Sequence, residues 1–376
     1  MLFVFLWNVR FTDLPNTLDY KRRFTIIRIK YLLKGKESMI YNNVELHNVE
    51  ELQPAPGGNG VVLNRFPSRV TEALKGRGSF VSRSATGCEI RFASSATTIW
   101  VTLEAMVYDL PITVFCGDFV YKKITVKANT KATIQLDKNQ MFGAVGSEFF
   151  KSFKQSFNIN VWRLHINSVE SNCIFHEVSG LDGVVRPPFN GEQPKKTWLA
   201  YGSSITHGVG CDDTSNSYIQ HTARLLKADV LCKGMSGACC CEKEIANYIA
   251  GAKWDFATLE LGVNMYGFKT KDFKKRAQYL IETVHEAKPD NKVFVITPFP
   301  NYTCFVQDKD SVQKHKDYVD ILTEIVTNIH SENVVLINGD DVLEQYTYLS
   351  SDMVHPSEFG HSRMGENLYN IMKSKL

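Results

Sequence analysis

A serine, a glycine, an asparagine and an Asp-His pair stand in four short segments. The first three directly follow an apolar run, and the fourth comes later, after the last apolar run of this kind. The segments are Gly202-Ser203-Ser204-Ile205-Thr206, Gly234-Met235-Ser236-Gly237, Gly262-Val263-Asn264 and Asp352-Met353-Val354-His355-Pro356. A serine hydroxyl is a weak nucleophile until a neighbouring imidazole accepts its proton, and the imidazole needs a carboxylate to fix its tautomer. We therefore predict Ser204 as a nucleophile, with His355 and Asp352 as its acid-base partners.

Acyl transfer also requires hydrogen-bond donors for the negative oxygen of the tetrahedral intermediate. The backbone N–H groups of Ser204 and Gly237 and the side-chain amide of Asn264 could supply three donors of this kind. We predict that these three groups form an oxyanion hole.

Each segment also has a simpler interpretation. A Gly-Ser-Ser sequence after a strand is commonly a helix N-cap or a turn, and Asn264 could cap the following helix. Gly237 could be a plain turn, and an isolated Asp-x-x-His pair is usually solvated. The occurrence of all four segments in order favours the catalytic interpretation. The pattern Gly-x-Ser-x-Gly of the ordinary α/β-hydrolases is missing, because Thr206 stands two residues after Ser204.

Apolar strands alternate with amphipathic helices after Lys196. We predict strands at 198–201, 230–232, 256–261, 293–297 and 334–337, and helices from about 217, over 243–250, 273–287 and 319–329, and from about 359. This alternation is typical of a parallel sheet covered by helices on both faces. Functional groups in such a sheet gather at the carboxyl ends of the strands, where the four polar segments stand. The pattern therefore predicts a three-layer α/β domain.

A different period governs the chain from about Val61 to Val178. Apolar residues alternate with other residues in short runs, for example Ile99, Val101 and Leu103, and Trp162, Leu164 and Ile166. Short alternating strands separated by turns predict an antiparallel β-sandwich or jelly roll.

The aperiodic segment 186–196 contains three Pro and reads as a linker. We therefore expect a β-sandwich domain over 39–185 and the α/β domain over 197–376. Residues 1–38 are expected to form an N-terminal extension outside the fold.

Charge argues against nucleic acid as a partner. Residues 1–38 carry eight Lys or Arg against three acids, so the remaining 35 basic and 37 acidic residues leave residues 39–376 at −2. This body offers no basic stripe of the kind that nucleic-acid binding needs. The apolar run Met1–Trp7 is too short to span a bilayer, so no membrane partner is expected.

Nine cysteines without a recognisable signal peptide favour a reducing, cytoplasmic location, although secretion stays open. The run Cys239-Cys240-Cys241 lacks the C-x-x-C spacing of a zinc site, so we expect structural packing there rather than metal binding.

The four segments resemble the blocks of the SGNH, or GDSL, hydrolase family. The first block of that family, Gly-Asp-Ser-Ile or Leu, matches Gly202 to Ile205, and its later blocks match Gly237, Gly262-Val263-Asn264 and Asp352 to Pro356. Ser203 departs from the pattern, because the family usually has Asp there. The resemblance implies a flavodoxin-like fold and esterase, lipase or carbohydrate deacetylase activity without metal or cofactor. The β-rich half resembles the sandwich that precedes the catalytic domain in carbohydrate esterases of the family.

The leading hypothesis is hydrolysis of a small acyl ester, with an O-acetylated sugar as the substrate suggested by fold analogy. One alternative is an acyltransferase that passes the acyl group to an alcohol other than water. Another is a binding protein in which the sandwich acts and the α/β domain is inert. The acyl chain length and the oligomeric state are not determined by the sequence.

Overall fold

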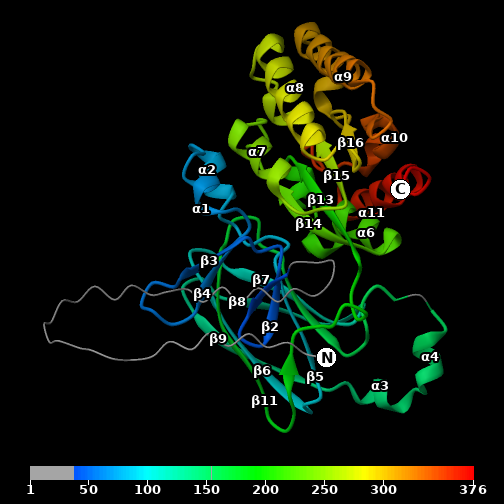
Figure 1. Ribbon diagram of the computed structural model, residues 1–376. Coiled ribbons are helices and arrows are strands. Elements are labelled where there is room, and N and C mark those ends of the chain that lie inside the picture. Colours follow the sequence, from blue (N-terminus) through cyan, green and yellow to red (C-terminus); the bar gives the residue numbers. More distant parts are fainter. Residues whose placement is uncertain (1–37, 154) are drawn as a thin grey trace, which may run out of the picture.

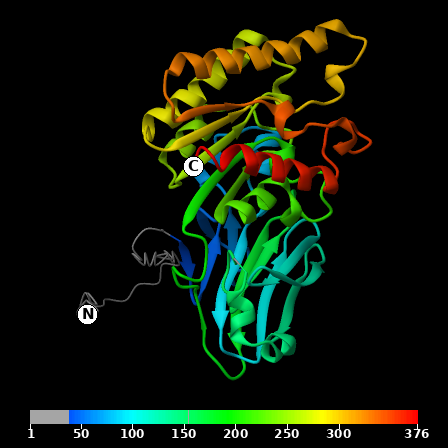
Figure 2. The same ribbon diagram turned by 90° about the vertical axis from the view of Figure 1, so that its right-hand side faces the viewer.

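The computed structural model describes residues 38–376, except residue 154. Two domains lie one above the other, with the α/β domain at the top of Figure 1 and the β-rich domain below it. Figure 2 gives the same division from the side. The predictions for the extension, including the run Met1–Trp7, concern a segment that lies outside the described residues except for Ser38.

The N-terminal domain is formed by two antiparallel sheets, as the alternating pattern predicted. The first sheet has the order β1 (Met39–Tyr41), β2 (Val44–His47), β5 (Glu89–Ser94), β10 (Val161–Ile166), β7 (Leu110–Cys116) and β8 (Phe119–Val126), with β12 (Val185–Arg186) also beside β5. The second has the order β3 (Glu51–Pro54), β4 (Val61–Asn64), β11 (Cys173–Gly180), β6 (Thr98–Ala105) and β9 (Lys131–Asp137). Val101 of β6 and Val114 of β7 belong to one buried core, so the two sheets pack face to face.

Four short helices lie in the described part of this domain, and the alternation of apolar residues did not predict them. They are α1 (Ser68–Thr71), α2 (Arg77–Val81), α3 (Gln140–Ala144) and α4 (Ser147–Lys151). The segment that contains α1 and α2 buries Phe66, Val70 and Leu74 in the core of the other domain. The β-rich half therefore extends into the α/β domain instead of only resting on it.

The C-terminal domain is a parallel sheet with helices on both faces, which confirms the predicted fold class. Its strands are β13 (Lys196–Gly202), β14 (Ala228–Gly234), β15 (Phe256–Glu260), β16 (Lys292–Ile296) and β17 (Val334–Ile337), in the order β14-β13-β15-β16-β17. The longer helices are α6 (Tyr218–Leu226), α7 (Lys243–Gly251), α8 (Thr270–Ala287), α9 (Lys309–Ile329) and α11 (Glu358–Met372). Counted from β13, the strand order is 2-1-3-4-5, the flavodoxin-like arrangement.

Two separate cores lie on the two faces of this sheet. Leu199 and Tyr201 point to the face covered by α7, α8 and α9, whereas Trp198 and Ala200 point to the face covered by α6 and α11. Successive side chains of a strand alternate between faces, so a strand buried on both sides must be apolar throughout. The continuous apolar runs in the sequence have this physical origin.

Buried ion pairs and hydrogen bonds join the two domains along β14. Arg91 of β5 donates to both carboxylate oxygens of Asp229, each at 2.8 Å. The fully buried guanidinium of Arg65 donates to the carbonyls of Cys232 and Gly234 at 3.0 and 3.1 Å. These contacts cover the edge strand of the parallel sheet with the N-terminal domain.

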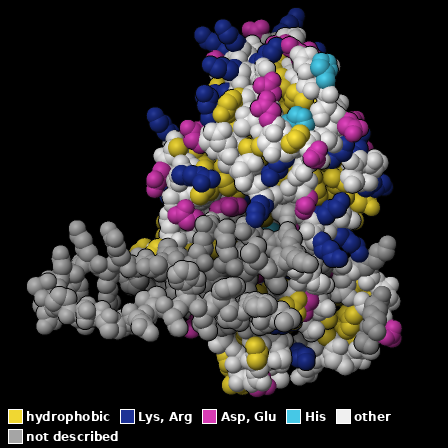
Figure 3. Space-filling model, viewed as in Figure 1, with side chains coloured by type: hydrophobic (Ala, Val, Ile, Leu, Met, Phe, Trp, Pro, Cys, Tyr) yellow, Lys and Arg dark blue, Asp and Glu magenta, His cyan; other side chains and the backbone are white. Residues whose placement is uncertain are grey.

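Within the described residues, no helix combines the length and the apolar character needed to cross a membrane. On the face drawn in Figure 3, Lys and Arg side chains are interspersed with Asp and Glu over the α/β domain. This mixture agrees with the nearly neutral balance calculated for residues 39–376.

Candidate active site

The proposed nucleophile lies at a sharp turn between a strand and a helix. Strand β13 ends at Gly202, and α5 (Ser204–His207) begins two residues later. The hydroxyl of Ser203 accepts the backbone N–H of Ile205 at 3.2 Å, so Ser203 is the N-cap and Ser204 is the first residue of the helix. A helix N-terminus directs N–H groups and positive potential toward the reacting centre.

The structure brings Ser204, His355 and Asp352 together in one hydrogen-bonded line. Ser204 Oγ lies 2.8 Å from His355 Nε2, and His355 Nδ1 lies 2.7 Å from Asp352 Oδ2. Ser204 is buried, whereas the side chains of His355 and Asp352 are 23% and 51% exposed. The line therefore runs from the base of the site to solvent, and the geometry suits proton transfer from a serine hydroxyl.

Hydrogen bonds keep Asp352 ionised. Burial alone would raise the pKa of this carboxyl, but hydrogen bonds from the ring and backbone N–H of His355, the N–H of Val354 and the hydroxyl of Ser350 hold the pKa well below its usual range. The backbone N–H groups of Val354 and His355 lie 2.8 and 2.9 Å from Oδ1. A carboxylate held in this way can fix the tautomer of the imidazole and stabilise its protonated form.

The loop that carries Gly237 is attached to the nucleophile turn. The N–H of Met235 donates to the carbonyl of Gly202 at 2.8 Å, and the N–H of Ser236 donates to His207 Nδ1 at 3.4 Å. Burial lowers the pKa of His207 well below its usual range, so this imidazole stays neutral and can accept. Gly237 itself has a φ of +69°, a left-handed conformation that favours glycine.

Asn264 lies in the short helix η2 (Val263–Met265) and caps neither this helix nor the following helix α8, because their N-cap residues are Gly262 and Lys269. Its Oδ1 accepts the backbone N–H of Cys239 at 3.1 Å. This bond joins the third polar segment to the loop of Gly237 and leaves the two N–H groups of the amide as donors. The simpler interpretation of Asn264 as a helix cap is therefore wrong.

Two residues of the site were not identified from the sequence. Arg77 of α2 donates from Nε to the carbonyl of Ser236 at 3.2 Å, and its aliphatic stem covers Gly237. Only the tertiary fold brings this residue of the N-terminal domain to the loop. Glu260, the last residue of β15, lies fully buried behind the nucleophile turn. Its charge within the run 256–261, which is otherwise uncharged, could have indicated a functional residue in the sequence.

The cysteine run and the neighbouring aromatic residues belong mainly to the core. Cys239 and Cys241 are buried, and burial raises the pKa of both thiols well above the usual value. Tyr201 and Tyr218 are also fully buried and belong to the core. All nine cysteines are free thiols.

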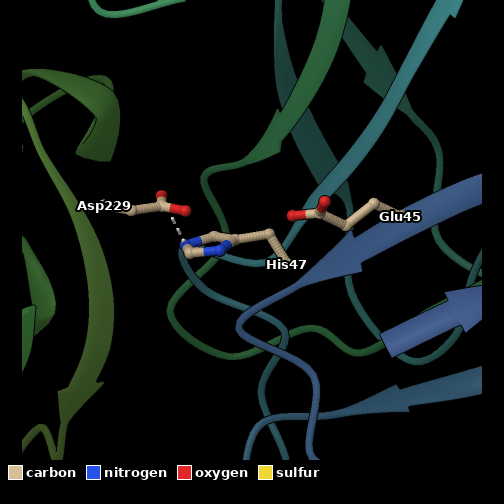
Figure 4. Close-up of side chains that lie close together, drawn as sticks. All are labelled: Glu45, His47 and Asp229. Carbon is tan, nitrogen blue, oxygen red and sulfur yellow. Dashed lines mark ion pairs between the residues drawn. The ribbon is translucent and has the colours of Figure 1, made fainter. Parts of the chain in front are cut away.

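One group of described residues has ligand atoms close enough for a metal ion, namely Glu45, His47 and Asp229. Figure 4 places His47 between the two carboxylates, with Glu45 and His47 on β2 and Asp229 on β14. Arg91 lies against both carboxylates, 3.6 Å from Glu45 and 2.8 Å from Asp229. Because the Arg91 guanidinium already pairs with both carboxylates, we interpret the group as part of the domain interface. It stands near the start of β14, at the opposite end of the strand from the Gly234 loop.

Comparison with known proteins assigns the family of the α/β domain. Residues 200–363 match the model of the GDSL-like Lipase/Acylhydrolase family. This domain is a GDSL-like lipase/acylhydrolase domain. No curated protein matches the sequence.

Several solved structures are similar to this chain over most of its length. A salicylyl-acyltransferase from a tetracycline biosynthetic pathway superposes with a TM-score of 0.74 at 16% identity, covering 90% of this chain and 96% of its own. A family two carbohydrate esterase from Clostridium thermocellum superposes with a TM-score of 0.58 at 16% identity, covering 78% of this chain and 93% of its own. An acetyl xylan esterase from Butyrivibrio proteoclasticus superposes with a TM-score of 0.53 at 12% identity, covering 77% of this chain and 90% of its own. At these identities the likeness concerns the fold.

Proposed function

We propose that the protein is a serine esterase that hydrolyses small acyl esters through an acyl-enzyme at Ser204. The observation that carries the proposal is the hydrogen-bonded line from Ser204 through His355 to Asp352. His355 Nε2 accepts the proton as Ser204 Oγ attacks the ester carbonyl, and later returns it to the leaving alcohol. A water molecule activated by the same imidazole then releases the acid.

The charge that develops on the carbonyl oxygen needs donors. We assign this role to the backbone N–H groups of Ser204 and Gly237 and to the amide of Asn264. The attachment of the Gly237 loop to both the nucleophile turn and Asn264 supports this assignment, because it holds the three segments together.

For the substrate, we propose an O-acetyl group on a carbohydrate. The carbohydrate esterases among the similar structures support this class, although the likeness to them is one of fold. A panel of p-nitrophenyl esters of increasing chain length, run beside acetylated sugars, tests the proposal. Preference for acetyl esters and release of acetate from a sugar are expected, and activity confined to long acyl chains would contradict it.

A second candidate is transfer of the acyl group to an alcohol other than water. The salicylyl-acyltransferase favours it, since that structure superposes over 90% of this chain with a TM-score of 0.74, against 0.58 and 0.53 for the two esterases. Product analysis with and without an added acceptor alcohol distinguishes the two reactions. Labelling of Ser204 by a fluorophosphonate distinguishes both from a binding protein without catalysis.

A further inference from the structure

Glu260 is a buried carboxyl group directly behind the proposed nucleophile. It is the last residue of the strand Phe256–Glu260, whose other residues carry no charge, and its side chain is fully inaccessible to solvent. Its neighbour Gly202 has no Cβ, and a Cβ built there would lie only 2.5 Å from Glu260 Oε2. The glycine thus leaves room for a carboxylate against the backbone of the turn.

The contacts of Glu260 flank Ser204 on both sides. Its Oε2 accepts the backbone N–H of Ser203 at 2.6 Å and the hydroxyl of Thr206 at 3.2 Å. Ser203 precedes Ser204 by one residue, and Thr206 follows it by two. One carboxylate oxygen therefore holds the N-cap and the first turn of α5 in a single arrangement.

The burial of the Glu260 carboxylate destabilises the fold, so a role in stability does not explain why the residue is there. Its second oxygen, Oε1, is buried and has no hydrogen-bond partner among the described residues. Burial raises the pKa of Glu260 to about 7, against the opposing effect of the hydrogen bonds from Ser203 and Thr206. Buried polar atoms without partners are rare and destabilising, and they concentrate at functional sites.

We propose that Glu260 is a positioning residue for catalysis, whose carboxylate fixes Ser203 and Thr206 so that Ser204 faces His355. The proposal rests on the proposed function of Ser204. Glu260 does not contact the reacting atoms and acts through the two residues that it holds. The ionised form is the active one, because a hydrogen bond to a charged acceptor is stronger than one to a neutral acceptor.

The groups that face Glu260 do not ionise near pH 7, so they add no step to the pH response. They are Tyr218 from α6, Cys239 and Cys241 from the loop after β14, and Tyr266, which follows η2. Burial raises the pKa of all four, so each of them is neutral near pH 7. Protonation of His355 is common to the wild type and the variants, so it cancels when their rates are compared at one pH.

Ionisation of Glu260 has opposite effects on activity and on stability. Between the ordinary glutamate value of 4.5 and about 7, the folded protein holds a proton that the unfolded chain has released. The free energy of unfolding therefore falls as the pH rises through this window. Activity rises over the same window as the carboxylate forms. If Glu260 served only the fold, activity and the free energy of unfolding would not change in opposite directions with pH.

The experiment compares Glu260→Gln with a matched control, Glu242→Gln. Glu242 is a second carboxyl with a pKa raised by burial and with one buried oxygen that lacks a hydrogen-bond partner among the described residues. It is the N-cap residue of α7 and lies outside the nucleophile turn. Glutamine keeps the shape and cannot ionise. For both variants, kcat, KM and melting temperature are measured from pH 5 to pH 9 with p-nitrophenyl acetate.

Above pH 8, Glu260→Gln should lower kcat about tenfold to 10²-fold with little change in KM, as expected for a misplaced nucleophile. The difference in kcat between Glu260→Gln and the wild type should narrow below pH 6, where Glu260 of the wild type is protonated. The melting temperature at pH 8 should be unchanged or higher. Glu242→Gln should retain the pH profile of the wild type.

A second variant keeps the test decisive if Glu260→Gln does not fold. Thr206→Val removes one donor to the carboxylate and raises the pKa of Glu260 further, so the ratio of its kcat to that of the wild type should fall as the pH drops from 9 to 7. Protonation of His355 affects both proteins alike and does not change this ratio. Wild-type kcat in Glu260→Gln at pH 8, or a kcat ratio of Thr206→Val to the wild type that does not change with pH, would overturn the proposal. A loss of kcat by the same factor at every pH, with a lower melting temperature, would show a purely structural role. Absence of both turnover and Ser204 labelling in the wild type would instead refute the proposed function.

Discussion

At the scale of single residues, the site depends on a serine activated by its neighbours. Ser204→Ala should abolish ester turnover and leave the fold intact, because it removes the atom that lies 2.8 Å from His355 Nε2. Ser203→Ala should cost much less, since that hydroxyl caps a helix. Steady-state kinetics and circular dichroism on both variants test this. Unchanged turnover in folded Ser204→Ala would move the nucleophile elsewhere, with Ser203 the first candidate.

The orienting carboxylate gives a second prediction. Asp352→Asn should lower kcat severely, by about 10⁴-fold, because the amide stabilises the wrong imidazole tautomer. The wild-type rate should fall on acidification, since protonated His355 cannot accept the serine proton. The low pKa of Asp352 means that this carboxyl does not add a step above pH 4. Most of the rate retained in Asp352→Asn would mean that another group orients the imidazole.

Variants of Asn264 distinguish a role in binding the transition state from a role in the fold. Asn264→Ala should lower kcat by about 10²–10³-fold with KM little changed, the effect of losing one oxyanion donor. The loss of the bond to Cys239 should also lower the melting temperature modestly. Asn264→Asp is the sharper variant, because it keeps an acceptor for Cys239 and removes the donors. Near-normal kcat in both variants would exclude Asn264 from the oxyanion hole.

At the scale of elements, the edge strand β14 and the N-terminal domain depend on each other. Asp229→Asn should destabilise the protein by roughly 3–5 kcal/mol, because it leaves the buried Arg91 guanidinium without its bidentate partner. Arg91 retains Glu89 at 2.7 Å, so we expect the lower end of this range. Urea unfolding at pH 7 measures the change. A difference below about 1 kcal/mol would mean that the interface does not depend on this pair.

At the scale of the whole molecule, the two domains should fold together. A chain that begins at Met39 retains β1 and should fold and hydrolyse esters normally. Loss of expression or activity would make residues 1–38 part of the fold. A chain that begins at Lys195 should aggregate, because it uncovers β14 and removes Phe66 and Val70 from the core beside α7. Size-exclusion chromatography and kinetics on both chains provide the comparison, and a soluble monomer from Lys195 would contradict the second expectation.

The sequence by itself determined the fold class and the neighbourhood of the site. Parallel strands buried on both faces must be apolar and must alternate with helices, so periodicity located β13 to β17. Polar residues directly after β13, β14 and β15 were conspicuous, because the strands before them are largely apolar. The four short helices of the β-rich domain escaped prediction, because segments of four or five residues display no helical period.

Only the tertiary structure decided how the parts complement one another. Polar side chains such as Arg91 and Asp229 resemble surface residues in the sequence, and their burial depends on a partner 138 residues away. The same holds for Arg77 beside Gly237 and for Glu260 behind Ser204. Hydrophobic patterns record which face of an element is buried, but a buried charge is stable only where the fold supplies its partner. Such residues can therefore be recognised only when both sides of the contact are in place.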